Sequence, residues 1–138
     1  MPQTWTNWAR EQRCAPERVE RPASEEELQR IVRRARAIRA VGSGHSFTDI
    51  ACTDGVLVDL SRMHRVLAVD GADVTVEAGI TLRALGEELA GRRLALENQG
   101  DIDAQTLAGA IATATHGTGG RFRNLSSQVV GMRIVDGA

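Results

Sequence analysis

The chain has 138 residues, the length of one domain of common size and too short for a large two-domain enzyme. Its 17 basic residues, all of them arginine, nearly balance 18 acidic ones, so we exclude a nucleic-acid partner held mainly by its phosphates. No apolar run approaches the ~20 residues that a membrane span needs, so we expect no membrane span.

The N-terminal residues and the two cysteines bear on location. Residues 1–13 are polar and lack both the apolar core and the small-residue cleavage site of a secretion signal. Cys14 and Cys52 are far apart in the sequence and have no second pair, which suits a reduced cytosolic protein better than a disulfide framework. We therefore expect a cytoplasmic protein with one surface thiol and one buried thiol.

The first elements are a helix and a strand. Ser24 followed by Glu27 has the spacing of a capping box, and apolar residues then recur at helical spacing, which predicts a helix over residues 24–37. Residues 38–41 form a short β-type run that stops at Gly42. A glycine-rich loop follows this strand.

Shorter elements fill the rest of the chain. Strands are predicted over residues 56–60, 65–70 and 74–78, separated by turn signals. Leucines at positions 82, 85 and 89 predict a second helix, and a weak strand, a short helix and a final strand are predicted over 94–96, 106–114 and 129–135. The pattern indicates one compact α+β unit with two glycine-rich loops.

The first glycine loop has the composition of an anion-binding turn. In Val41-Gly42-Ser43-Gly44-His45-Ser46, the glycines allow positive φ and let main-chain N–H groups approach a pyrophosphate. It is not a Rossmann fingerprint, because no third glycine follows. It is not a P-loop either, because the chain contains no lysine.

The second loop alternates hydroxyl and small residues over 112–119 and would suit close packing on a flat or phosphorylated ligand. Taken alone, each loop is more typical of an ordinary turn than of a cofactor site. The histidines at positions 45, 64 and 116 lack metal-ligand spacing, and we expect no metal site. No serine lies in the G-x-S-x-G elbow of a hydrolase.

Taken together, residues 39–55 and 98–119 resemble two signature segments of the aldonolactone and alditol oxidase family of the vanillyl-alcohol oxidase superfamily. The similarity runs from the Trp5-x-Asn7-Trp8 opening to the last residue, and is strongest to the actinobacterial L-gulono-1,4-lactone dehydrogenases. The resemblance implies a PCMH-type FAD-binding domain of two α+β subdomains with FAD between them, followed by a substrate domain. On this basis residues 1–138 would be the N-terminal part of that domain, incomplete and without the substrate domain.

The resemblance also implies residues that contact FAD, and none that is catalytic. In the first loop these are Ala40, Val41, Gly42, Ser43, Gly44, His45 and Ser46. The second group comprises Asp101, Thr106, Gly109, Thr113, Ala114, Thr115 and His116. His45 matches a position that bonds covalently to the flavin in many relatives but not in all, so both alternatives stay open. Asp101 stands where some relatives have a hydroxyl residue.

The implied reaction is transfer of a hydride from the CH–OH group of a sugar lactone or polyol to flavin, with oxygen or a carrier such as a cytochrome as electron acceptor. Two alternatives remain for the 138 residues alone: a truncated cofactor-binding fragment with no turnover, which we favour, or a truncated product that binds nothing tightly. Truncation would expose apolar surface along 107–112 and 129–135, so a homodimer or strand exchange is a further hypothesis.

Overall fold

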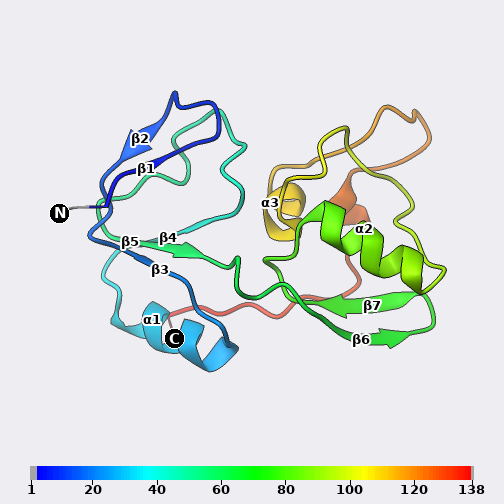
Figure 1. Ribbon diagram of the computed structural model, residues 1–138, viewed down its shortest axis with the longest axis horizontal. Coiled ribbons are helices and arrows are strands. Elements are labelled where there is room, and N and C mark those ends of the chain that lie inside the picture. Colours follow the sequence, from blue (N-terminus) through cyan, green and yellow to red (C-terminus); the bar gives the residue numbers. More distant parts are fainter. Residues whose placement is uncertain (1–2, 138) are drawn as a thin grey trace. The chain divides into compact units, whose positions relative to one another are not determined.

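The computed structural model describes residues 3–137 and divides into two compact units. Unit 1 runs up to residue 63 and takes in residues 133–137, and unit 2 comprises residues 64–132 (Figure 1). Both units contain strands and helix, so each is an α+β unit. The prediction of one compact unit is therefore wrong, because the strands before and after residue 63 pair into separate sheets.

A three-stranded parallel sheet forms the centre of unit 1. Its order is β3 (Arg18–Glu20), β5 (Val56–Asp59), β4 (Ile38–Val41), and both outer strands pair with β5 around Leu57. Three consecutive residues of β5, at positions 56–58, are buried, as expected of a central parallel strand covered on both faces. Strand β4 ends where the first glycine loop begins.

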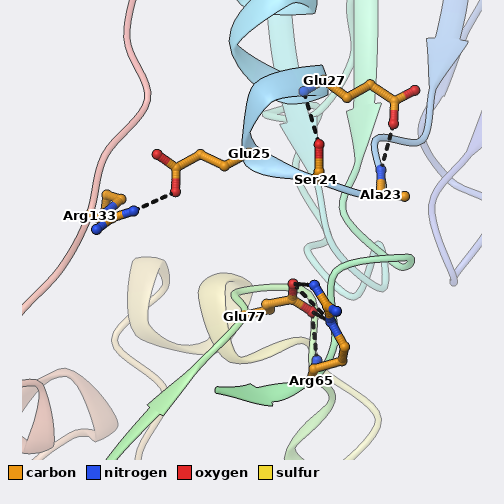
Figure 2. A network of polar contacts seen from close by, with 7 residues as sticks. All are labelled: Ala23, Ser24, Glu25, Glu27, Arg65, Glu77 and Arg133. Atoms are coloured by element: carbon orange, nitrogen blue, oxygen red, sulfur yellow. Dashed lines mark hydrogen bonds and ion pairs between the residues drawn. The ribbon is translucent and has the colours of Figure 1, made fainter. Parts of the chain in front are cut away.

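Helix α1 (Glu25–Arg34) connects β3 to β4 and begins at the predicted N-cap, with a variant of the capping box in which Glu27 reaches one residue before Ser24. The Ser24 hydroxyl accepts the N–H of Glu27, and the Glu27 carboxylate accepts the N–H of Ala23 (Figure 2). The helix ends three residues earlier than predicted, with Ala35 in an extended conformation. The segment between α1 and β4 also contacts the sheet, because the carbonyl of Ala37 accepts the N–H of Val56 at 2.9 Å.

Two very short strands, β1 (Trp5–Thr6) and β2 (Arg13–Cys14), pair antiparallel at the start of unit 1. The buried Asn7 organises the turn between them, because its Oδ1 accepts the N–H groups of Glu11 and Gln12. At the other end of the unit, Arg133 pairs with a carboxylate in the first turn of α1. The residues after 132 therefore belong to unit 1.

Unit 2 begins with a hairpin of β6 (Val66–Asp70) and β7 (Asp73–Val76), followed by α2 (Leu82–Gly91), α3 (Leu107–Ala112) and the 3₁₀ helix η1 (Leu125–Gln128). Two buried clusters hold these elements together. The first contains Ile80, Leu85 and Leu89, and the second contains Leu82, Ala110 and Leu125. The apolar positions of α2 thus contribute to both clusters.

Two predicted strands are absent. Residues 94–96 are coil, and Leu94 and Leu96 are apolar because they pack on the two clusters. Residues 129–135 have the composition of a strand, but within residues 3–137 no segment forms a ladder with them. In the same described part of the chain, no helix combines the length and apolarity needed to cross a membrane.

Candidate functional site

The first glycine loop follows β4 and is held by the N-terminal turn of unit 1. Gly44 has φ +68°, and a Cβ atom at this position would lie 3.2 Å from the Trp5 ring. Its carbonyl accepts the N–H of Trp8 at 2.8 Å, and the Asn7 amide donates to the Ser46 carbonyl at 3.0 Å. The loop thus has a fixed backbone, with glycine required by both conformation and space.

The predicted residues of this loop differ in exposure. Ala40, Gly42 and Ser43 are exposed, and residues 44–46 are half-buried. The side chain of Val41 belongs to the core of unit 1, so only its main chain is available to a ligand. The structure therefore places Ala40 and Val41 at the end of β4, and residues 42–46 in the loop that follows it.

His45 has a ring partner that the sequence analysis did not assign. The indole of Trp8 stacks on its imidazole, with ring centroids 5.2 Å apart and planes at 18°. The Trp5-x-Asn7-Trp8 opening was visible as part of the family resemblance, but no spacing rule connects it to position 45. Trp8 and Asn7 are thus additional residues of the candidate site.

The second predicted group lies in unit 2, around α3. Thr106 is buried and caps the helix, accepting the N–H of Gly109. The Thr113 hydroxyl donates to the Gly109 carbonyl at 2.8 Å, and the Thr115 hydroxyl lies 3.4 Å from Gln105 Oε1. These hydroxyls already serve the local structure, whereas Ala114, His116 and Asp101 are exposed.

Two glycines allow residues 98–100 to lie directly against residues 115–117. A Cβ on Gly117 would lie 2.4 Å from the Gln99 carbonyl oxygen, and a Cβ on Gly100 would lie 2.9 Å from the Thr115 side chain. The Asn98 amide also donates to the Arg123 carbonyl at 2.9 Å. The second loop is therefore defined by close backbone packing, which the glycine positions in the sequence could indicate only in general terms.

These features fit a dinucleotide cofactor. The Gly44 turn contains two glycines, and its residues 42 and 43 are exposed, which leaves room for main-chain N–H groups to meet a diphosphate. The second loop also presents a short, exposed stretch at residues 112–114. Within residues 3–137, no group of three or more His, Cys, Asp or Glu side chains could hold a metal ion.

Comparison with known proteins identifies the family. Residues 16–138 match a family described as FAD binding domain. The chain belongs to this FAD-binding family. FAD is the cofactor of the family, as the resemblance implied.

The curated relatives of this FAD-binding chain include enzymes acting on sugar lactones. It is 58% identical to the L-gulono-1,4-lactone dehydrogenase of Mycobacterium tuberculosis over 95% of this chain and 32% of that protein. It is 42% identical to the L-gulonolactone oxidase of Bos taurus over 94% of this chain and 31% of that protein. The chain thus spans about a third of the length of these relatives.

Solved structures confirm the predicted PCMH-type fold. An alkyldihydroxyacetonephosphate synthase superposes with a TM-score of 0.80 and 26% identity, covering 90% of this chain and 26% of that one. A solvent-stable cholesterol oxidase superposes with a TM-score of 0.73 and 25% identity, covering 85% of this chain and 24% of that one. The FAD-binding chain therefore has the first part of the fold that these proteins share.

The two cysteines are both half-buried, which corrects the prediction of one surface and one buried thiol. They are also close together, because the thiol of Cys52 is hydrogen-bonded to that of Cys14. Burial, this hydrogen bond and the nearby negative charge of Asp49 raise the pKa of the Cys52 thiol from 9.0 to about 11. Cys52 is therefore a poor nucleophile at neutral pH.

We expect Cys52 to react slowly with iodoacetamide, because at a given pH below 9 its thiolate fraction is about a hundredfold smaller than that of a thiol with a pKa of 9.0. Its alkylation rate should keep rising with pH beyond the point at which an ordinary thiol levels off. Peptide mass spectrometry of a pH series measures this, with Cys14→Ala as the variant in which the hydrogen bond is removed and the rate rises. A wild-type rate equal to that of free cysteine would contradict the prediction.

Ala114 has φ 52°, a left-handed conformation that disfavours residues with a Cβ. It follows the C-cap of α3, where the N–H of Thr115 bonds to the carbonyl of Ala110 and closes the turn. Ala114→Gly should therefore raise the free energy of unfolding by about 1 kcal/mol. Urea denaturation measures the gain.

A matched control lies after α2, outside the predicted FAD contacts. Arg93 has φ 59°, and the N–H of Leu94 bonds to the carbonyl of Leu89 in the same way. Arg93→Gly should give a gain of the same sign and size. If Arg93→Gly raised the free energy of unfolding and Ala114→Gly did not, the left-handed conformation of Ala114 would not be a source of strain.

Proposed function

We propose that this chain holds FAD for an oxidoreductase that takes a hydride from the CH–OH group of a sugar lactone or polyol. The observation that carries the proposal is the Gly44 turn, whose two glycines and exposed residues 42 and 43 suit a diphosphate, in a chain of the FAD-binding family. The names of its relatives, an L-gulono-1,4-lactone dehydrogenase and an L-gulonolactone oxidase, support the substrate class.

Bound FAD would accept the hydride, and the residues of this chain would bind and orient it. We assign the N–H groups of the turn at residues 42–46 to the diphosphate and the imidazole of His45 to the flavin. The second loop, residues 113–116, would contribute through its backbone, since the Thr113 hydroxyl is already bonded to the Gly109 carbonyl. A covalent bond from His45 to the flavin is the alternative to a non-covalent contact.

A cofactor-binding role without turnover is a second candidate for residues 1–138, because none of the predicted site residues is assigned to proton abstraction. The electron acceptor, oxygen or a cytochrome, and a cytoplasmic location also stay predictions. Self-association is a further proposal, supported by the exposure of Val130 (82%) and Ile134 (74%).

The experiment is an absorbance spectrum of the purified chain before and after acid precipitation. Flavin in the pellet would support a covalent bond, and its loss from the pellet in His45→Ala would assign that bond. Flavin in the supernatant would support non-covalent FAD. A colourless chain that also fails to take up added FAD would overturn the proposal. Reduction of a dye by L-gulono-1,4-lactone or xylitol would distinguish turnover from cofactor binding alone.

A further inference from the structure

Trp8 is attached by its own backbone to the turn that carries His45. Its N–H donates to the Gly44 carbonyl at 2.8 Å, so residue 8 lies directly beside residue 44. The Trp8 side chain is 64% exposed, yet one face of its indole is stacked on the imidazole of His45. A large aromatic side chain that is mostly in water but packed on one ring is not explained by the core of unit 1.

The turn is held on both sides of His45 by the two residues of the same dipeptide. Trp8 bonds to the carbonyl of Gly44, and Asn7 bonds to the carbonyl of Ser46 at 3.0 Å. Asn7 is itself fixed, because it is 3% exposed and its Oδ1 accepts the N–H groups of Glu11 and Gln12 at 2.9 and 3.0 Å. The backbone at His45 is therefore rigidly placed by residues from the N-terminal turn.

A fixed backbone does not by itself fix the imidazole. Rotation about χ2 of histidine is broad, so the backbone leaves the plane of the ring loosely defined. A flat partner packed at 5.2 Å with planes at 18° fixes that plane, because an intermediate χ2 angle would break the stacked contact. The neighbouring aromatic Phe47 is equally exposed at 64%, but its ring does not stack on His45.

We propose that Trp8 is a positioning residue that holds the imidazole of His45 in the orientation in which it meets the flavin. This inference rests on the proposed function, in which FAD is bound by the turn at residues 42–46. The role is in orientation, and no bond to Trp8 is made or broken. Loss of a purely structural residue would affect folding, whereas loss of Trp8 is expected to change the His45 ring and FAD binding with little effect on folding.

The first test is made without cofactor. In NMR spectra of the chain, the ring protons of His45 should shift downfield in Trp8→Ala, because the shielding by the stacked indole is lost. Trp8→Phe should retain part of the shielding, and Phe47→Ala should leave the His45 signals in place. Circular dichroism of the same variants verifies folding, which an exposed side chain should scarcely affect. Unchanged His45 signals in Trp8→Ala would overturn the proposal.

The second test titrates FAD into the same four proteins and follows flavin fluorescence. We expect roughly three- to tenfold weaker binding in Trp8→Ala, partial rescue in Trp8→Phe and wild-type binding in Phe47→Ala. A shift of the His45 signals with unchanged FAD affinity would overturn the positioning role alone. A wild-type chain that takes up no FAD would overturn the proposed function and the role toward flavin with it, whereas the NMR result would still report the stack.

Discussion

Replacing Glu77 by glutamine is expected to lower the free energy of unfolding by about 2 kcal/mol. The side chain of Glu77 is 6% exposed and accepts from Arg65 through the backbone N–H at 2.8 Å, through Nη2 at 2.7 Å and through Nε at 3.1 Å (Figure 2). Glutamine has nearly the same shape but carries no charge, and its NH₂ group would face donors. Urea denaturation at neutral pH measures the loss.

The pH dependence of this effect has a definite sign. The hydrogen bonds from Arg65 hold the pKa of Glu77 below its ordinary value of 4.5. The unfolded carboxyl therefore binds its proton more tightly than the folded one, so the stabilisation is complete above pH 4.5 and is lost as the pH falls through the lower folded pKa. The difference in stability between wild type and Glu77→Gln should shrink over this acid range.

The exposed pair of Glu88 and Arg92 on α2 provides the control. Glu88 is 48% exposed, and Glu88→Gln should change stability by less than about 0.5 kcal/mol. If the two variants lost equal stability, or if the loss at Glu77 did not change with acidification, the ion pair of Glu77 would not be the stabilising contact that its geometry indicates.

Elements with a local signal were predicted well. The capping box at Ser24 located the start of α1, and the apolar run at residues 38–41 matched β4. The C-terminus of α1 was placed too late, because the sequence of residues 35–37 permits a helix, whereas the chain leaves the helix at Ala35 to reach β4, which pairs with β5 from Ile38 onward. Tertiary contacts determined the boundary that local propensity could not.

Elements without a local signal were missed. Strands β1 and β2 have two residues each, too few for a periodic pattern. Strand β3 alternates poorly and is a strand because it pairs with β5. In residues 129–135 the opposite error occurred, since β-type composition predicted a strand for which no ladder is present among the described residues.

The candidate site was located but its contacts were not. Glycine and hydroxyl residues marked both loops, and the resemblance marked their residues. The stack of Trp8 on His45 and the buried amide of Asn7 depend on chain segments about forty residues apart, for which a single sequence has no spacing rule. The site residues carried over from the family stay predictions that cofactor binding must test.

The second large effect is expected at Gly117, where alanine should lower the free energy of unfolding by about 1–3 kcal/mol. The new Cβ would lie 2.4 Å from the backbone oxygen of Gln99 and 2.5 Å from Asn98 Oδ1. The Asn98 side chain can move, but the Gln99 carbonyl cannot do so alone, because Gly100 is packed against Thr115 on the same pair of segments. The two segments must therefore separate.

Gly120 gives a control in the same loop, since a Cβ there meets no atom within 4 Å and its φ lies outside the left-handed region. Gly120→Ala should change stability by less than about 0.5 kcal/mol. Equal thermal stability of the two variants would contradict the close packing. FAD titration then separates two roles of Gly117. Separation of the segments displaces Thr115 and His116, so affinity should fall in Gly117→Ala if this loop binds the cofactor, and stability alone should fall if it does not.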